Sequence, residues 1–165
     1  MNKKVNWGII GLGNAAMNFA KASQLTDNAI LKGISSKNQK KISNFKELFE
    51  VKSEYCFDNY EDLINCSEIE AIYIALPNSM HHDFIVKCIE AKKKILVEKP
   101  ATKNFLEIKS IKEKYNINKF FYSEGFMYFH HPQILDVIQI LKKKLIGNLI
   151  TIKSKFGNNI NKFIY

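Results

Sequence analysis

Short apolar runs alternate with longer amphipathic stretches along residues 1–123 of the sequence. Runs of this kind are typical of strands that are buried on both faces of a sheet. The stretches between them carry apolar residues at helical spacing, and parallel strands need crossover segments of about a dozen residues or more. We therefore expect an α/β fold, with a doubly wound parallel sheet of five or six strands.

The boundaries of these elements follow from the same pattern. The expected strands are residues 5–10, 29–34, 55–57, 71–76, 94–97 and 119–123. The expected helices are residues 15–25, 40–49, 60–64, 80–91 and 104–115. Asn78 or Ser79 is expected to cap the helix that begins near Met80, since both side chains accept hydrogen bonds from backbone N–H groups.

Residues 124–165 differ from residues 1–123 in their pattern of apolar and polar residues. Residues 134–144 show the spacing of a helix, and residues 149–156 alternate like a strand with one buried face. No second strand follows that would pair with it. We expect residues 124–165 to be a connecting helix and first strand, which begin a second α+β domain that is cut short.

Charge, cysteine content and the length of the apolar runs argue against several classes of protein. The formal net charge is +9 and the pI about 9.4, but every basic residue is lysine and most are scattered, so the arginine forks that read nucleic acids are absent. The 3 cysteines have no C-x-x-C spacing, and we expect neither a disulfide nor a metal site. The apolar runs are too short for a bilayer. We expect a cytoplasmic protein that binds neither nucleic acid nor membrane.

A glycine-rich turn follows the first expected strand. Gly11 and Gly13 lie in a G-x-G-x-x-A pattern that ends at Ala16 and opens the first helix. In this context the first glycine permits a tight turn, and the second lets the backbone approach a pyrophosphate at the helix N-terminus. We expect a Rossmann domain that binds a dinucleotide through Gly11, Gly13, Asn14 and Ala15, the alternative being a purely structural turn.

The end of the second expected strand bears on the choice of cofactor. An acidic residue about 20 positions after the glycines usually holds the ribose hydroxyls of NAD. Here Ser35, Ser36 and Lys37 occupy the place, with no carboxylate. We expect these residues to bind the 2′-phosphate of NADP, with NAD still possible. The alternative is that Lys37 is simply solvated.

Three further segments complete a recognisable pattern. They are Ala75-Leu76-Pro77-Asn78-Ser79-Met80-His81-His82, Val97-Glu98-Lys99-Pro100, and Glu124-Gly125-Phe126-Met127-Tyr128 followed by His131-Pro132. In this order, together with the glycine turn, they resemble the Gfo/Idh/MocA oxidoreductases. The third segment is similar to the branch that holds NADP-linked xylose, glucose–fructose and dihydrodiol dehydrogenases.

The resemblance implies roles for individual residues. Leu76, Pro77, Asn78 and His81 match a segment that lines the cofactor, and Glu98 matches a residue near the nicotinamide ribose. Lys99 matches the active-site lysine that contacts the reacting hydroxyl or carbonyl and borders the cofactor. His82 is expected to face solvent. His131 matches the family's His-Pro pair, whereas Phe129 and His130 replace an arginine and an aromatic residue.

The implied activity is hydride transfer between NADP(H) and a carbinol or carbonyl carbon of a small sugar-like or polyol substrate. Full-length members are homo-oligomers with a second domain that supplies the substrate pocket and an Asp-x-x-x-His segment, and this chain ends before it. Whether the chain is an enzyme is therefore left open. The alternatives are a dinucleotide-binding protein without turnover and a different Rossmann enzyme, such as a methyltransferase.

Overall fold

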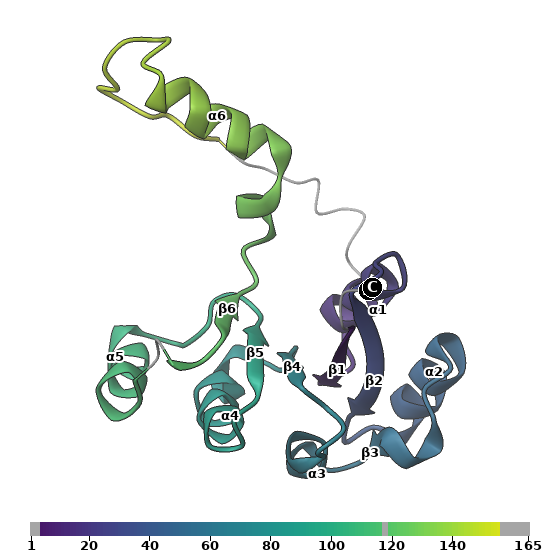
Figure 1. The fold of residues 1–165 in the computed structure, drawn as a ribbon. Coiled ribbons are helices and arrows are strands. Elements are labelled where there is room, and N and C mark those ends of the chain that lie inside the picture. Colours follow the sequence, from purple (N-terminus) through teal and green to yellow (C-terminus); the bar gives the residue numbers. More distant parts are fainter. Residues whose placement is uncertain (1–3, 117–118, 156–165) are drawn as a thin grey trace. The chain divides into compact units, whose positions relative to one another are not determined.

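The computed structural model describes residues 4–116 and 119–155, and its main feature is a six-stranded parallel sheet in the order β3-β2-β1-β4-β5-β6 (Figure 1). The strands are β1 (Val5–Ile10), β2 (Ala29–Ser35), β3 (Cys56–Phe57), β4 (Ala71–Ile74), β5 (Lys94–Val97) and β6 (Tyr122–Glu124). The order reverses between β1 and β4, as in dinucleotide-binding α/β domains. The expected doubly wound parallel sheet is confirmed.

Helices connect successive strands. They are α1 (Asn14–Gln24), α2 (Gln39–Phe49), α3 (Tyr60–Asn65), α4 (Asn78–Glu90) and α5 (Phe105–Lys114). Two apolar clusters cover the two faces of the sheet, one with α1 and α2 and the other with α3, α4 and α5. Neighbouring strand residues alternate between the clusters: Ile9 and Tyr73 belong to the first, and Ile10 and Ile74 to the second.

The start of α4 differs from the expectation. The helix begins at Asn78 with Pro77 in the N-cap position, and no side chain caps it. The expected cap by Asn78 or Ser79 is therefore wrong. The Asn78 amide instead donates a hydrogen bond to the carbonyl of Pro100, which is 22 residues away. The Asn78 side chain therefore binds a distant carbonyl instead of an N–H group at the start of its own helix.

The last strand is shifted from the expected residues 119–123. Pairing with β5 places Tyr122 opposite Ile95 and Glu124 opposite Val97, so β6 begins later and includes Glu124. Phe121 lies before the strand and is 63% exposed. The first and last residues of β6 are set by its register with β5. The apolar pattern of one strand alone does not contain that information.

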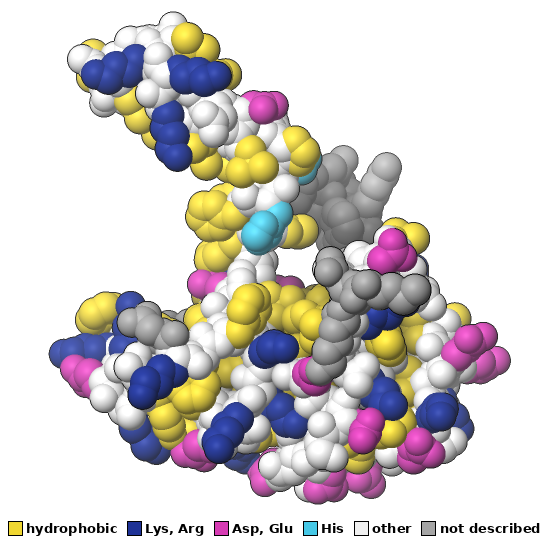
Figure 2. Space-filling view, in the orientation of Figure 1, with side chains coloured by type: hydrophobic (Ala, Val, Ile, Leu, Met, Phe, Trp, Pro, Cys, Tyr) yellow, Lys and Arg dark blue, Asp and Glu magenta, His cyan; other side chains and the backbone are white. Residues whose placement is uncertain are grey.

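The chain divides into two compact units, Met1–Phe126 and Met127–Tyr165. The second unit contains a 3₁₀ turn (Met127–His130) and helix α6 (Pro132–Lys142), and none of its described residues is buried. Many of its apolar side chains lie on the surface among lysines (Figure 2). The expected strand is absent from residues 149–155, where no partner strand pairs with the chain, and Phe156 lies outside the described residues.

None of the helices within the described ranges is long and apolar enough to cross a bilayer. Of the cysteines, Cys56 and Cys66 are partly buried and Cys88 is fully buried, all as free thiols. Burial raises the pKa of Cys88 to about 12. Cys88 therefore packs as a small apolar side chain in the core.

Candidate functional site

The sequence-predicted residues gather at the carboxyl edge of the sheet. The glycine turn follows β1, Ser36 and Lys37 follow β2, Leu76 and Pro77 follow β4, and Glu98 and Lys99 follow β5. Because the strand order reverses between β1 and β4, the crevice that binds ligands in open α/β sheets lies at this edge. The fold thus brings together segments that are up to 88 residues apart, from Gly11 to Lys99.

The two glycines of the turn have different functions. Gly11 adopts φ of +88°, and a Cβ at this position would lie 2.6 Å from the carbonyl oxygen of Ala75. Its N–H donates to the carbonyl of Ser35, which joins the turn to β2. A Cβ on Gly13 would meet no atom within 4 Å. Gly11 is therefore required by the fold, and Gly13 borders open space.

Helix α1 begins directly after Gly13. It has no side-chain cap and no acidic residue in its first turn, and Ala16 is fully buried against the sheet. The first N–H groups of such a helix lack intrahelical acceptors and carry its positive dipole end. This turn has the form of an anion-binding site for a phosphate group. Asn14 is exposed beside it, and Ala15 is partly exposed.

The end of β2 presents one cation to solvent. Ser35 is fully buried, and its hydroxyl has no hydrogen-bond partner among the described residues. Ser36 is 6% exposed, and its Oγ accepts a hydrogen bond from Asn38 N at 3.2 Å. The Lys37 ammonium is exposed and lies 5.6 Å from the centre of the Tyr60 ring. Of the three expected phosphate ligands, Lys37 is thus the accessible one.

Glu98 directly follows β5, and a residue of the neighbouring strand β4 holds its side chain. Its Oε1 accepts a 2.5 Å hydrogen bond from the Tyr73 hydroxyl, and its Oε2 accepts one from the Lys99 N–H at 3.2 Å. Burial, followed by the hydrogen bond and charge of Glu98, raises the pKa of Tyr73. Tyr73 is not among the residues that the sequence predicts for the site. The sequence did contain a signal for it, since Tyr73 is the one polar side chain of an otherwise apolar strand. A buried hydroxyl usually has a hydrogen-bond partner, so this residue could have been expected to bind a polar group nearby.

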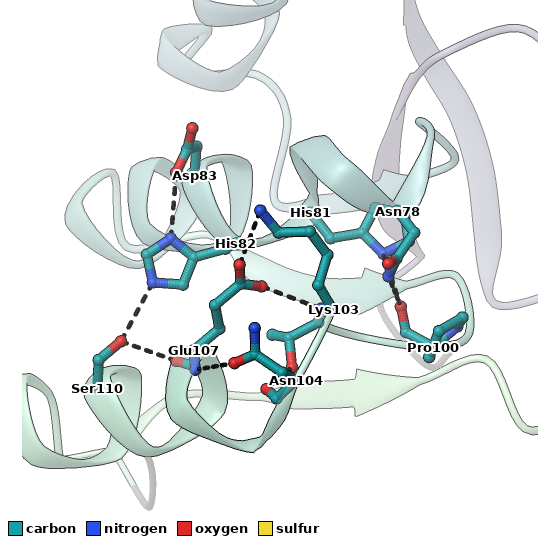
Figure 3. A network of polar contacts seen from close by, with 10 residues as sticks. Asn78, His81, His82, Asp83, Pro100, Lys103, Asn104, Glu107 and Ser110 are labelled. Carbon is teal, nitrogen blue, oxygen red and sulfur yellow. Dashed lines mark hydrogen bonds and ion pairs between the residues drawn. The ribbon is translucent and has the colours of Figure 1, made fainter.

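Residues 98–101, here called the lysine loop, are fixed at backbone atoms. The Pro100 carbonyl accepts a hydrogen bond from Asn78 Nδ2 at 2.5 Å, and its oxygen lies 2.9 Å from Nδ1 of the His81 ring (Figure 3). The Ala101 N–H donates to Glu124 Oε1 at 2.8 Å. The Lys99–Pro100 peptide bond is cis. Lys99 is exposed, and within the described residues its ammonium has no hydrogen-bond or ion-pair partner.

His81 is enclosed rather than open to the crevice. It is 1% exposed, with Nδ1 2.9 Å from the Pro100 carbonyl oxygen and Nε2 2.8 Å from that of Leu76. It therefore contacts two of the loops that border the site. Direct contact with a cofactor stays a prediction for His81, as it does for Leu76, Pro77 and Asn78.

The other histidines lie outside this arrangement. His82 is partly buried and does not simply face solvent. Its ring contacts Asp83, the next residue on α4, and Ser110 on α5 (Figure 3). His131 caps α6 in the second unit by accepting from Gln133 N. Within the parts of the chain that the structure describes, no three histidine, cysteine or acidic side chains are placed to hold a metal.

Comparison with known proteins gives a consistent result. The sequence profile of the Gfo/Idh/MocA oxidoreductases, an oxidoreductase family with an NAD-binding Rossmann fold, matches residues 5–126. The trans-1,2-dihydrobenzene-1,2-diol dehydrogenase of Xenopus laevis is 25% identical over 93% of this chain and 47% of its own length. Oxidoreductase P35 of Formosa agariphila is 30% identical over 98% of this chain and 50% of its own length. The chain thus spans about half the length of these curated relatives.

Solved structures share the fold. The 3-ketoreductase KijD10 from Actinomadura kijaniata, in complex with NADP, superposes with a TM-score of 0.77 at 25% identity, over 88% of this chain and 46% of its own. The apo scyllo-inositol dehydrogenase from Lactobacillus casei superposes with a TM-score of 0.81 at 22% identity, over 89% of this chain and 44% of its own.

Proposed function

The chain belongs to the Gfo/Idh/MocA oxidoreductase family, and on this premise we propose that it is the cofactor-binding half of an NADP(H)-dependent dehydrogenase acting on a sugar-like or polyol substrate. The observation that carries the proposal is the convergence, at one edge of the sheet, of the glycine turn, Lys37 and the lysine loop. In this proposal the glycine turn binds the pyrophosphate, and Lys37 discriminates between NADP(H) and NAD(H). The lysine loop faces the reacting carbon of the substrate.

The residues at this edge fit a dinucleotide. The open space at Gly13 and the uncapped start of α1 suit a pyrophosphate, which takes hydrogen bonds from backbone N–H groups. Glu98 offers a carboxylate for a ribose hydroxyl, and its orientation is set by Tyr73. When bound, the nicotinamide supplies the hydride chemistry, and the protein orients the substrate and handles its proton.

A preference for NADP(H) follows from charge. The end of β2 carries no carboxylate that would bind the ribose diol of NAD or repel a 2′-phosphate. Lys37 is the exposed cation there, and a charge-assisted hydrogen bond contributes about 1.5–3 kcal/mol. This corresponds to a preference of roughly 10- to 100-fold. One structural relative, the 3-ketoreductase KijD10, was likewise solved in complex with NADP.

Lys99 is proposed to contact the substrate. Its backbone is fixed on both sides by bonds to Glu98, Asn78 and Glu124, which leaves the ammonium available to donate a hydrogen bond to a substrate oxygen. Such a bond polarises a carbonyl for reduction, or holds a hydroxyl for oxidation. Relatives named for diol, keto-sugar and inositol chemistry favour a substrate with neighbouring hydroxyl groups.

A second candidate is a protein that binds the dinucleotide without turnover. It is favoured by the second unit, in which no described residue is buried. The two candidates share the cofactor site. They differ in whether NADPH is oxidised when keto-sugars or inosose-type ketones are added.

The proposal is tested by calorimetric titration with NADPH and with NADH. We expect micromolar NADPH binding, with NADH at least about 10-fold weaker. Lys37→Met is expected to lower the ratio of the two affinities to near one. Lys112→Met, which removes the same charge from an exposed position on α5, is the matched control and leaves the ratio unchanged. A ratio insensitive to Lys37→Met would contradict the NADP preference.

A further inference from the structure

The ammonium of Lys37, at the end of β2, lies over an aromatic ring that belongs to another element. The ring is that of Tyr60, the first residue of α3, and its centre is 5.6 Å from the Lys37 ammonium nitrogen. A cation within about 6 Å of a ring centre is attracted by the negative face of the π system. The contact thus connects the exposed cation of the site to a helix that carries none of the expected site residues.

The Tyr60 ring is itself held in place. Asn59 caps α3, because its side-chain oxygen accepts a hydrogen bond from the Glu61 N–H at 3.1 Å. The Tyr60 ring packs edge-on against Phe84 of α4, with the ring centres 5.3 Å apart and the planes at 88°. Phe84 is 8% exposed and belongs to the apolar core. The ring therefore has a fixed backbone below it and a buried neighbour beside it.

The backbone on both sides of Lys37 is also fixed. The Ser36 N–H donates to the Phe57 carbonyl at 3.2 Å, and the Asn38 N–H donates to the Ser36 hydroxyl oxygen at 3.2 Å. The Asn38 side chain in turn caps α2 by accepting from the Lys41 N–H at 3.1 Å. What stays free to move at Lys37 is thus the side chain, and Tyr60 is the ring that it contacts.

The contact leaves the charge of Lys37 unneutralised. None of the ion pairs formed by the described residues includes Lys37. Glu61, the carboxylate next to Tyr60, pairs with Lys87 instead. A carboxylate in the place of the ring would neutralise the ammonium and repel a phosphate group, whereas the ring carries no net charge. An aromatic partner therefore orients the cation and keeps it available to an anion.

We propose that Tyr60 is a positioning residue that determines cofactor specificity, because its ring holds the Lys37 ammonium in place for the 2′-phosphate of NADP(H). This inference rests on the proposed function. A lysine side chain loses rotamer entropy when a ligand orders it. The ring restricts the side chain before the ligand arrives, so less entropy is lost on binding. NADH has no 2′-phosphate, and its affinity should not depend on Tyr60.

Calorimetric titration of Tyr60→Leu with NADPH and NADH tests the role of the ring. We expect NADPH affinity to fall about 2- to 5-fold, the range of an exposed cation–π contact, while NADH affinity is unchanged. Retained NADH binding also shows that the variant is folded. Tyr60→Phe keeps the ring and should keep the wild-type ratio of the two affinities. Equal losses for both nucleotides in Tyr60→Leu would show a purely structural role and overturn the proposal.

The matched control is Tyr115→Leu. Tyr115 directly follows α5, and its ring centre lies 4.9 Å from the Lys114 ammonium. This variant removes the same type of contact from a helix that ends at the edge of the sheet opposite the site. We expect the NADPH-to-NADH ratio of affinities to stay at the wild-type value. A fall as large as that in Tyr60→Leu would show that the effect is not specific to Tyr60.

A double-variant cycle asks whether Tyr60 acts through Lys37. In the Lys37→Met background the cation is gone, so the added Tyr60→Leu change should leave the ratio of affinities where Lys37→Met alone puts it. A further fall as large as that caused by Tyr60→Leu in the wild-type background would mean that the ring acts independently of Lys37, and the proposal would be wrong.

The contact is also measurable without any nucleotide, by proton NMR of the Lys37 ε-methylene group. Its resonance is identified by its absence from the spectrum of Lys37→Met. A ring face shifts nearby protons upfield, so the resonance should move downfield in Tyr60→Leu and stay in place in Tyr60→Phe. An unchanged resonance in Tyr60→Leu would show that the ring does not hold the side chain.

The two proposals fail in distinguishable ways. If the wild type binds neither nucleotide, the proposed function is wrong and the specificity role of Tyr60 is wrong with it. If the wild type prefers NADPH and Tyr60→Leu keeps the full preference, the proposed function stands and the role of Tyr60 does not.

Discussion

At the scale of single residues, the site depends on polar groups whose partners lie on other strands. Tyr73 belongs to β4, yet its hydroxyl orients the carboxylate of Glu98, the residue after β5. Tyr122 on β6 is partly buried, and its hydroxyl, which is buried, has no hydrogen-bond partner among the described residues. Burial, followed by the charge of Glu124, raises the pKa of Tyr122 to about 12. Two phenols in one sheet thus have opposite energetic roles.

Replacement of Tyr73 by phenylalanine should therefore destabilise the protein. The change removes a donor from a partly buried carboxylate, which costs about 1–2 kcal/mol. NADPH binding should also weaken, because Glu98 loses the bond that orients it. Urea unfolding and calorimetry measure the two effects. Tyr122→Phe is the matched control and is expected to be neutral or slightly stabilising, so equal losses in both variants would contradict this account.

Gly11 and Gly13 lie in the same turn, but alanine at position 11 should affect folding, whereas alanine at position 13 should affect cofactor binding. Alanine at position 11 would adopt φ of +88° with its Cβ 2.6 Å from the Ala75 oxygen, which should cost at least about 2 kcal/mol of folding stability. Alanine at position 13 meets no neighbour and should cost less than about 1 kcal/mol. Its Cβ occupies the space proposed for the pyrophosphate, so NADPH affinity should fall at least about 10-fold. A Gly13→Ala protein with normal affinity would place the pyrophosphate elsewhere.

At the scale of elements, one lysine anchors the edge of the sheet opposite the site. Lys93 lies in the turn between α4 and β5 and is 9% exposed. Its ammonium donates to the carbonyls of Cys66 and Ile69, 2.8 and 2.7 Å away, in the segment between α3 and β4. Burial lowers the pKa of Lys93. This side chain thus joins the starts of the two strands whose opposite ends carry the site.

Lys93→Met should cost about 2 kcal/mol of folding stability, because two carbonyls in this segment lose their charged donor while the aliphatic packing is retained. Lys94→Met removes the same charge from the adjacent exposed residue and should change stability by less than about 0.5 kcal/mol. Chemical denaturation of the three proteins tests this. Similar midpoints for both variants would show that the Lys93 bonds do not stabilise the fold.

The elements themselves were largely predictable from the sequence, because a buried parallel strand is a local apolar run. Strand β4 and the glycine turn after β1 illustrate this: their residues alone indicated a doubly wound sheet with a dinucleotide site. The parts that failed depend on distant partners. Asn78 does not cap α4 because Pro100 lies within its reach, and β6 is shifted because Ile95 pairs with Tyr122.

The same reason explains what was missed at the site. The sequence placed Glu98 and Lys99 at a strand end, but not the Tyr73 hydroxyl or the two carbonyls that meet His81. Each of these contacts joins residues on different elements, and no local spacing encodes them. The roles of Lys37 and Lys99 toward ligands stay predictions.

At the scale of the whole molecule, the two units differ in what stabilises them. Both apolar clusters lie within the first unit, on either face of the sheet. In the second unit no described residue is buried, and side chains such as Met127 and Ile150 are 84% and 94% exposed. Since burial of apolar surface is the main favourable term in folding, the first unit should carry nearly all the stability of this chain.

A chain that ends at Phe126 should accordingly fold on its own. We expect cooperative urea unfolding with a free energy within about 1 kcal/mol of that of the 165-residue chain, since few buried contacts are removed. NADPH affinity should agree within about 2-fold, because every residue proposed for the cofactor site precedes position 126. Circular dichroism, denaturation and calorimetry on the two chains make the comparison. Loss of cooperative unfolding in the shorter chain would mean that the second unit stabilises the sheet through contacts that its exposed surface does not reveal.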